Sequence, residues 1–217
     1  MKIKIYLVIV ALIFFYACGS KKVESPQYPI SDNLTQEDNA SYYKELEELI
    51  EKVNNNTITI CSYKNKAIFE YNDEKIKVKM KGAVDKDCDN NGEINIFGPF
   101  GVVLYNAKYQ NGVLELKKDN EYLMLNNKSI SKISKMIKYL YLFNYPGIRP
   151  TKDFTFVKDN DAVIFNKDNV TIYTKDYKIN KIDIDNLTVH YNIKDGTIKE
   201  ILLINRKNHK YLKINFD

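Results

Sequence analysis

Alternation of apolar and charged residues at every second position is the feature that most restricts the fold of this chain. The clearest instance is residues 75–81, where Ile76, Val78 and Met80 alternate with lysines. Successive side chains of a β-strand point to opposite faces of the sheet, so this segment predicts a strand with one buried and one wet face. The same period returns at residues 212–216.

Turn dipeptides separate the alternating segments. Asn91-Gly92, Asn111-Gly112 and Asp195-Gly196 each lie between two such segments. Asn-Gly and Asp-Gly adopt the left-handed backbone of tight hairpin turns without strain. The domain therefore contains consecutive antiparallel strands.

A further hairpin is expected at Asp73-Glu74, and it sets a register for the first two strands. Phe69 would lie opposite Val78, and by the same count Ala67 lies opposite Met80 and Tyr63 opposite Val84. In this register the apolar residues of both strands share one face. A shift by one residue would instead place Phe69 against Lys77.

Two segments carry apolar residues at helical spacing. Residues 35–53 form the first, with Thr35 and Asp38 in the pattern of a capping box. Residues 129–144 form the second, which closes at Pro146-Gly147. An antiparallel sheet with one wet face must cover its other face, and these helices are the material for it. The expected fold class is α+β, mainly β: a curved antiparallel sheet wrapped around helices.

The N-terminus has the pattern of a secretory signal. Two lysines precede an apolar run over residues 5–17, which is short for a bilayer span. The run ends at Cys18, and residues 16–19 resemble the lipobox of bacterial lipoproteins, although Tyr16 is unusual at its position. The resemblance implies removal of residues 1–17 and acylation of Cys18. The alternative is an ordinary cleaved signal, or an apolar anchor with an incidental cysteine.

A lipid-anchored chain would be held at a membrane by its acyl groups. Gly19 stands where the enteric sorting rule has aspartate for inner-membrane retention, which makes the periplasmic face of the outer membrane the expected location. The rule does not transfer to every phylum, so the inner membrane stays open. Residues 18–33, with two prolines, read as a flexible tether that could extend roughly 40 Å. Residues 34–217 then form one domain.

Charge and chemistry exclude several function classes. Loss of Lys2 and Lys4 with the signal lowers the formal net charge from +5 to +3, and no nucleic-acid partner is expected. His190 and His209 lie on separate segments, and the chain lacks the nucleophile, phosphate-loop and zinc motifs of common enzymes. We therefore predict no enzyme, no catalytic residue, no metal and no cofactor.

Residues 87–92 match the first half of a calcium loop, with carboxylate or amide side chains at Asp87, Asp89 and Asn91. The position of the bidentate glutamate is Gly98, and strands flank the loop where a calcium loop has helices. Calcium is therefore the weaker interpretation of this motif.

Cys61 and Cys88 remain once Cys18 is acylated. The expected register sets Cys61 opposite Lys86, two residues from Cys88, and compartments outside the inner membrane are usually oxidising. A disulfide between them is predicted. Two separate buried thiols are the alternative.

The region from residue 57 to the end resembles the outer-membrane lipoprotein receptors of the LolB type and the broader LolA/LolB-like group. The first matching motif is Gly98-Pro99-Phe100-Gly101 followed by an apolar strand. The second is the apolar helix that ends at residues 140–146, with Asn144 where glycine is usual. The third is a closing hairpin from residues 187–190 to residues 212–216.

The resemblance implies an unclosed antiparallel half-barrel whose helices cover the concave face, and whose apolar concavity holds acyl chains. The tryptophans often found on that face in enteric members are missing, since this chain has none. The residues expected to line the cavity are Phe69, Ile76, Val78, Met80, Leu104, Leu114, Met136, Leu140 and Phe143. Met136, Leu140 and Phe143 would point from the covering helix to the strands.

The resemblance also implies a role for the loop at Pro99, Phe100 and Gly101, whose apolar residue would insert into the membrane when cargo is released. The expected protein is a monomer that accepts acyl chains of lipoproteins or lipids, in one scheme from a LolA-like periplasmic carrier, and delivers them to the outer membrane. A core aromatic at Phe100 is the alternative for the loop. An envelope assembly or structural lipoprotein with a filled core is the alternative for the function.

Overall fold

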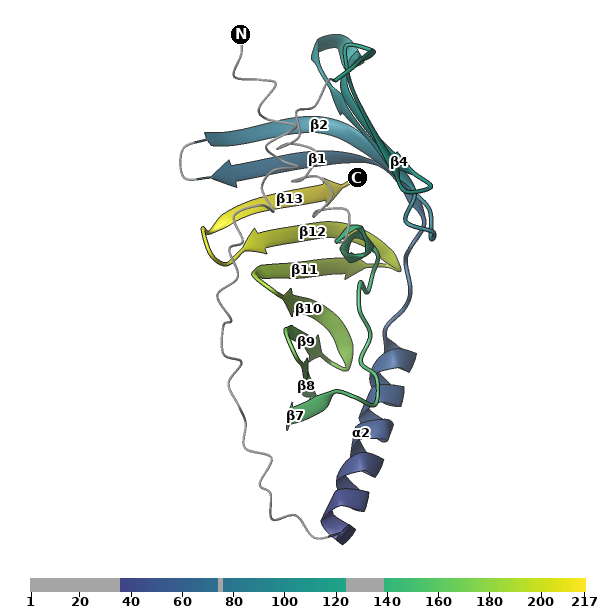
Figure 1. Ribbon diagram of the computed structural model, residues 1–217, viewed down its shortest axis with the longest axis vertical. Coiled ribbons are helices and arrows are strands. Elements are labelled where there is room, and N and C mark those ends of the chain that lie inside the picture. The colour runs from purple at the N-terminus through teal and green to yellow at the C-terminus, as the bar shows by residue number, and fades with distance from the viewer. Residues whose placement is uncertain (1–35, 74–75, 124–138) are drawn as a thin grey trace.

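A computed structural model describes residues 36–73, 76–123 and 139–217. In these ranges the chain forms one helix of 21 residues, α2 (Gln36–Asn56), two short 3₁₀ helices and thirteen strands (Figure 1). The 3₁₀ helices are η2 (Pro99–Gly101) and η3 (Leu140–Phe143). The strands are β1 (Tyr63–Asp73), β2 (Ile76–Lys86), β3 (Gly92–Phe97), β4 (Val103–Gln110), β5 (Val113–Lys118), β6 (Glu121–Tyr122), β7 (Thr155–Asp159), β8 (Ala162–Lys167), β9 (Val170–Lys175), β10 (Lys178–Ile184), β11 (Leu187–Lys194), β12 (Thr197–Asn205) and β13 (Lys210–Phe216).

All thirteen strands belong to one antiparallel sheet. Its order is β6-β5-β4-β3-β2-β1-β13-β12-β11-β10-β9-β8-β7, so strands that pair are consecutive in sequence except at the seam between β1 and β13. The two edge strands, β6 and β7, do not pair with each other. The mainly β antiparallel sheet expected from the alternation is therefore confirmed, as is the unclosed sheet that the family resemblance implied.

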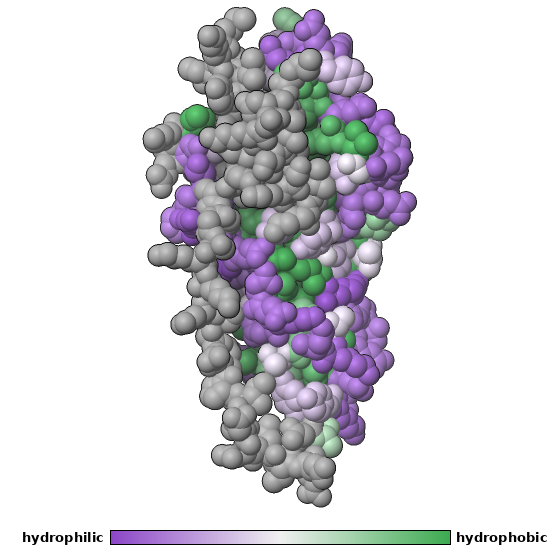
Figure 2. Space-filling view, in the orientation of Figure 1, coloured by the Kyte–Doolittle hydropathy of each residue, from purple (hydrophilic) through white to green (hydrophobic). Residues whose placement is uncertain are grey.

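One face of the sheet, here called the inner face, holds the core. Leu46, Leu49 and Val53 of α2 and Leu142 of η3 pack in one cluster with buried side chains of β1–β4 and β8–β13. These helix positions repeat at intervals of three and four residues, which places them on one side of α2. No helix in the described ranges has the length and hydropathy to cross a bilayer. In Figure 2 hydrophilic residues form most of the right-hand margin of the molecule, and hydrophobic residues show as patches inside that margin.

The register of β1 and β2 differs from the expected one by two residues. Phe69 pairs with Met80, and the ladder continues to Asp73 and Ile76. The reason lies in the Asp73 side chain, whose Oδ1 accepts a hydrogen bond from the Ile76 amide at 3.0 Å. Asp73 therefore ends the strand rather than opening the turn. A shift of two keeps the apolar residues of both strands on one face.

The hairpin turns at Asn111-Gly112 and Asp195-Gly196 are confirmed. Both residues of each turn have positive φ, and the flanking strands pair directly. Asn91-Gly92 differs, because Gly92 already belongs to β3 and the turn occupies residues 87–91.

Two predictions for the second half of the chain differ from the structure or concern residues outside the described ranges. Residues 129–138 of the expected second helix lie outside the described residues, and residues 140–143 form a 3₁₀ turn after which Asn144 is extended. The segments at residues 187–190 and 212–216 do not form a hairpin, because β12 lies between β11 and β13. The chain needs this additional strand to bring its end back beside β1.

Candidate functional site

The loop between β3 and β4 presents the most exposed aromatic residue in the described ranges. Phe100 is fully exposed, at 104% of its reference area, and Val102 is 60% exposed. Phe100 has φ 60° and ψ 16°, a left-handed conformation that side chains other than glycine and asparagine rarely adopt. The alternative of a core aromatic therefore does not hold for Phe100.

The loop around Phe100 is tightly folded. The Gly98 amide donates to the Val102 carbonyl at 2.8 Å, and the Gly101 amide donates to the Gly98 carbonyl at 3.3 Å. A Cβ at Gly98 would lie 2.5 Å from Leu104 Cγ, so only glycine allows this approach. Gly101 has φ 77°. The backbone thus fixes Phe100 outward while the loop base packs against Leu104.

The expected cavity residues do not form one lining. Phe69 is buried in the core, whereas Ile76, Val78, Met80 and Leu114 are half-buried. The pairing register places these five on the inner face.

Leu104 does not lie with these five residues on the inner face. The register shifts between Ile96 and Phe97, so Tyr105 pairs with Ile96 and Leu104 lies beside Gly98 at the base of the loop. Leu140 and Phe143 lie in η3, and Met136 lies outside the described residues.

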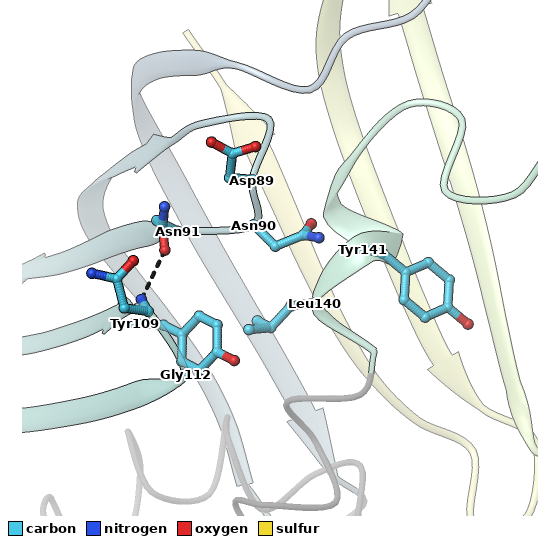
Figure 3. Close-up of a pocket in the computed structure, with 8 residues that line it drawn as sticks. Asp89, Asn90, Asn91, Tyr109, Gly112, Leu140 and Tyr141 are labelled. Carbon is cyan, nitrogen blue, oxygen red and sulfur yellow. Dashed lines mark hydrogen bonds between the residues drawn. The ribbon is translucent and has the colours of Figure 1, made fainter.

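A cavity of about 560 Å³ opens between the loop after β2, the turn between β4 and β5, and η3 (Figure 3). Leu140 is the one expected cavity residue among the described residues that line it. The Tyr109 ring and Leu140 point toward one another across this space, while the Tyr141 ring points away. The lining residues are Asp89, Asn90, Asn91, Tyr109, Asn111, Gly112, Leu140 and Tyr141. The lining is mostly polar, so this cavity does not suit an acyl chain.

A disulfide and a buried lysine hold the loop after β2 in place. Cys61 and Cys88 are bonded, with their Cα atoms 4.6 Å apart. Continuing the observed register beyond Tyr63 and Lys86 places these two cysteines directly opposite each other. Lys86 Nζ donates to the Asp87 carbonyl at 2.8 Å and to Asn90 Oδ1 at 3.2 Å. Burial lowers the pKa of the Lys86 ammonium.

The half calcium motif serves the same loop. Asp87 Oδ1 accepts from the amides of Asp89 and Asn91 at 2.9 Å, and Asp87 Oδ2 accepts from Asn91 Nδ2 at 2.9 Å. These bonds, led by the one from the Asn91 side chain, lower the pKa of the Asp87 carboxyl. The described residues contain no group of His, Cys, Asp and Glu side chains suited to a metal ion. The motif therefore closes a turn.

Two tyrosines position η3, the half-buried Tyr63 and the buried Tyr191, and the sequence did not reveal this role. Tyr63 donates to the Phe143 carbonyl at 3.0 Å, and Tyr191 donates to the Leu142 carbonyl at 2.8 Å. Burial raises the pKa of both phenols, so they remain donors at neutral pH. Both tyrosines project from strands onto the segment that crosses the sheet. They satisfy carbonyls that would otherwise be unpaired in the core.

The chain has only distant similarity to known protein structures. No family model matches it, and no curated protein matches it. A LolA superfamily protein, NE2245 from Nitrosomonas europaea, has a TM-score of 0.46 at 9% identity, with 79% of this chain and 91% of that chain covered. A putative outer membrane lipoprotein-sorting protein domain from Vibrio parahaemolyticus has a TM-score of 0.42 at 9% identity. The similarity covers 81% of this chain and 91% of that chain. The Pseudomonas aeruginosa MucA/MucB complex has a TM-score of 0.29 at 12% identity, with 81% and 55% covered. The function has to be argued from the chain itself.

Proposed function

We propose that this protein is a lipoprotein anchored through acylated Cys18 to the periplasmic face of the outer membrane, where it binds acyl chains and delivers them to the bilayer. The acyl chain would lie on the inner face of β2–β5, along Ile76, Val78, Met80 and Leu114. The Phe100 loop would enter the bilayer during release. A soluble carrier in the periplasm would supply the cargo, and no covalent step is required.

The exposure of Phe100 carries this proposal. Burying a phenylalanine side chain contributes about 1.5–3 kcal/mol, and a rigid loop that withholds this residue from the core needs another apolar partner. The interior of a bilayer is such a partner. The half-buried apolar row on β2 and β5 supports the acyl-binding part of the proposal.

The second candidate is a structural envelope lipoprotein with no transfer role. It is favoured by the filled core beneath α2, where Val53, Phe165 and Ile182 have no exposed area, and by the polar lining of the cavity beside η3. Mass spectrometry separates the two candidates. Protein purified without residues 1–18 carries acyl lipid under the first and none under the second.

The test of the transfer role is Phe100→Glu. We expect the variant to keep its melting temperature and its binding of a fluorescent fatty acid, because Phe100 is exposed. Transfer to liposomes should slow by about tenfold or more, because a charged side chain then replaces the apolar one that would enter the bilayer. Val113→Glu is the matched control, since Val113 is equally exposed as Val102 and lies at the opposite end of β4 and β5. Unchanged transfer by Phe100→Glu would refute the role of the loop.

A further inference from the structure

A row of lysines lies on the outer face of the sheet, opposite the core. Lys77, Lys79 and Lys81 of β2 are all exposed, as are Lys64 and Lys66 of the neighbouring β1. The alternation of β2 places its three lysines on one side, away from Val78 and Met80. Five ammonium groups therefore share one surface of the β1–β2 hairpin.

Ion pairs neutralise two of these five lysines. Lys79 Nζ lies 2.9 Å from Glu70 Oε1, and Lys64 Nζ lies 2.7 Å from Asp85 Oδ2. In the part of the chain that the structure describes, Lys66, Lys77 and Lys81 have no acidic partner within 4.0 Å. These three, here called the free lysines, give the surface an excess of positive charge.

The pairing register explains why these three lysines have no acid at the cross-strand position in the described ranges. Lys77 lies opposite Asn72, Lys81 opposite Ile68 and Lys66 opposite Ala83. Cross-strand neighbours are the partners that a sheet offers to a long charged side chain. The sequence supplies acids at the two other cross-strand positions and neutral residues at these three.

One of the free lysines, Lys81, lies at the point where β2 meets the strand that leads into the Phe100 loop. β3 and β2 pair up to Ile96 and Gly82. One further step along both strands brings Phe97 beside Lys81, and the Phe100 turn begins two residues later. A cationic row and an exposed apolar loop thus meet at the end of β3.

We propose that the free lysines and the Phe100 loop together dock this protein on a bilayer that contains anionic lipids. The inference rests on the proposed function, and it adds the class of lipid that the loop meets. Interfacial binding combines buried apolar area with attraction to anionic headgroups. Each lysine near such a surface raises affinity by roughly fivefold, so three raise it by roughly a hundredfold at moderate salt. Electrostatic docking orients the loop, and the aromatic then enters the bilayer.

A competing explanation is that the lysines protect an open strand edge. In the described residues the half of β2 before Gly82 has no partner on the β3 side, and lysines on such an edge prevent pairing with another chain. Under that explanation their removal causes self-association. Binding to vesicles would then not depend on lipid charge.

The test compares two triple variants of the chain from residue 19 onward, which retains every described helix and strand. One is Lys66→Gln/Lys77→Gln/Lys81→Gln. The control is Lys175→Gln/Lys178→Gln/Lys194→Gln, which removes three exposed lysines that have no ion pair among the described residues. Co-sedimentation is measured with vesicles of phosphatidylglycerol and phosphatidylethanolamine, and with vesicles of phosphatidylcholine alone, at low and high salt.

We expect the first variant to lose about a hundredfold in affinity for the anionic vesicles, and the control to lose less than tenfold. Wild-type binding to these vesicles should weaken with salt, whereas binding to phosphatidylcholine should be weak throughout. Equal losses in the two variants, or self-association of the first with unchanged vesicle binding, would overturn the inference. Phe100→Glu separates the two proposals, because it should slow acyl transfer and leave the salt dependence in place.

Discussion

The two halves of the sheet bury their inner faces to different degrees. The body comprises α2, η3, β1 and β7–β13, and the hood comprises β2–β6. All of the largest fully buried side chains, including Phe165, Leu203 and Ile214, belong to the body. The hood has Val84, Ile96, Tyr105 and Leu116 as its buried apolar residues, and none of them is as completely enclosed.

The helical segments and most of the buried cluster belong to the body. Leu46, Leu49 and Val53 of α2 and Leu142 of η3 lie in a cluster to which the hood contributes only Val84, Ile96 and Tyr105 among the described residues. Over the hood, Ile94, Met80 and Leu114 remain half-buried, and four of the most exposed apolar residues lie there: Phe100, Val102, Val113 and Tyr122. The most completely enclosed part of the core thus lies in the body, and more apolar surface stays accessible in the hood.

A leucine-to-alanine substitution in each half should give the largest difference in the free energy of unfolding. Leu203→Ala in the body should lower the free energy of unfolding by about 4 kcal/mol, because Leu203 is 1% exposed and sits in a closed core. Leu116→Ala in the hood should cost about 2 kcal/mol, since its surroundings are free to relax. Urea unfolding of both variants measures the difference. Equal losses would mean that the hood is packed as closely as the body.

The disulfide connects the two halves, and its removal should give the next effect on the free energy of unfolding. Cys61 lies between α2 and β1, whereas Cys88 lies in the hood loop after β2, 27 residues later. In the chain-entropy account, closing such a loop stabilises the fold by about 3–4 kcal/mol. Cys61→Ser/Cys88→Ser should lose this amount in urea unfolding without reductant. Wild-type protein in reductant is the control, and it should match the double variant. A double variant as stable as the oxidised protein would show that the bridge does not hold the hood.

Local patterns predicted the elements well and their long-range partners poorly. The turns at Asn111-Gly112 and Asp195-Gly196 carry glycine and were identified. Five similar two-residue turns in the described ranges begin at Asp119, Asn160, Asp168, Asp176 and Asp185, each with positive φ at its first residue but with no glycine. Asparagine and aspartate tolerate this conformation, yet they are also common in other loops, so their signal is weaker.

The contacts that assemble the site join residues far apart in the sequence. The β1–β13 seam pairs Ala67 with Phe216, and the Tyr191 hydroxyl anchors η3 at Leu142. No local period encodes such pairs. The hydrogen bond from the Ile76 amide to the Asp73 side chain accompanies a β1–β2 register that differs by two residues from the expected one. The apolar pattern cannot distinguish these two registers, because both place the same side chains on the inner face. The outward position expected of Phe100 came from the proline and glycine beside it.

The smallest effect on stability should come from exchanging two residues that have the same backbone conformation. Phe100 and Asn111 both have positive φ, 60° and 50°, in tight turns of the hood. A left-handed conformation costs a phenylalanine about 1 kcal/mol, while asparagine adopts it more readily. Phe100→Asn should therefore raise the free energy of unfolding by up to about 1 kcal/mol, and Asn111→Phe should lower it by a similar amount. Thermal melting measures both changes.

If Phe100→Asn instead melts several degrees below wild type, Phe100 makes stabilising contacts that its exposure does not indicate. The expected gain would show that the chain keeps a strained aromatic at this position at a small cost in stability, and the same variant should then transfer acyl chains to liposomes more slowly.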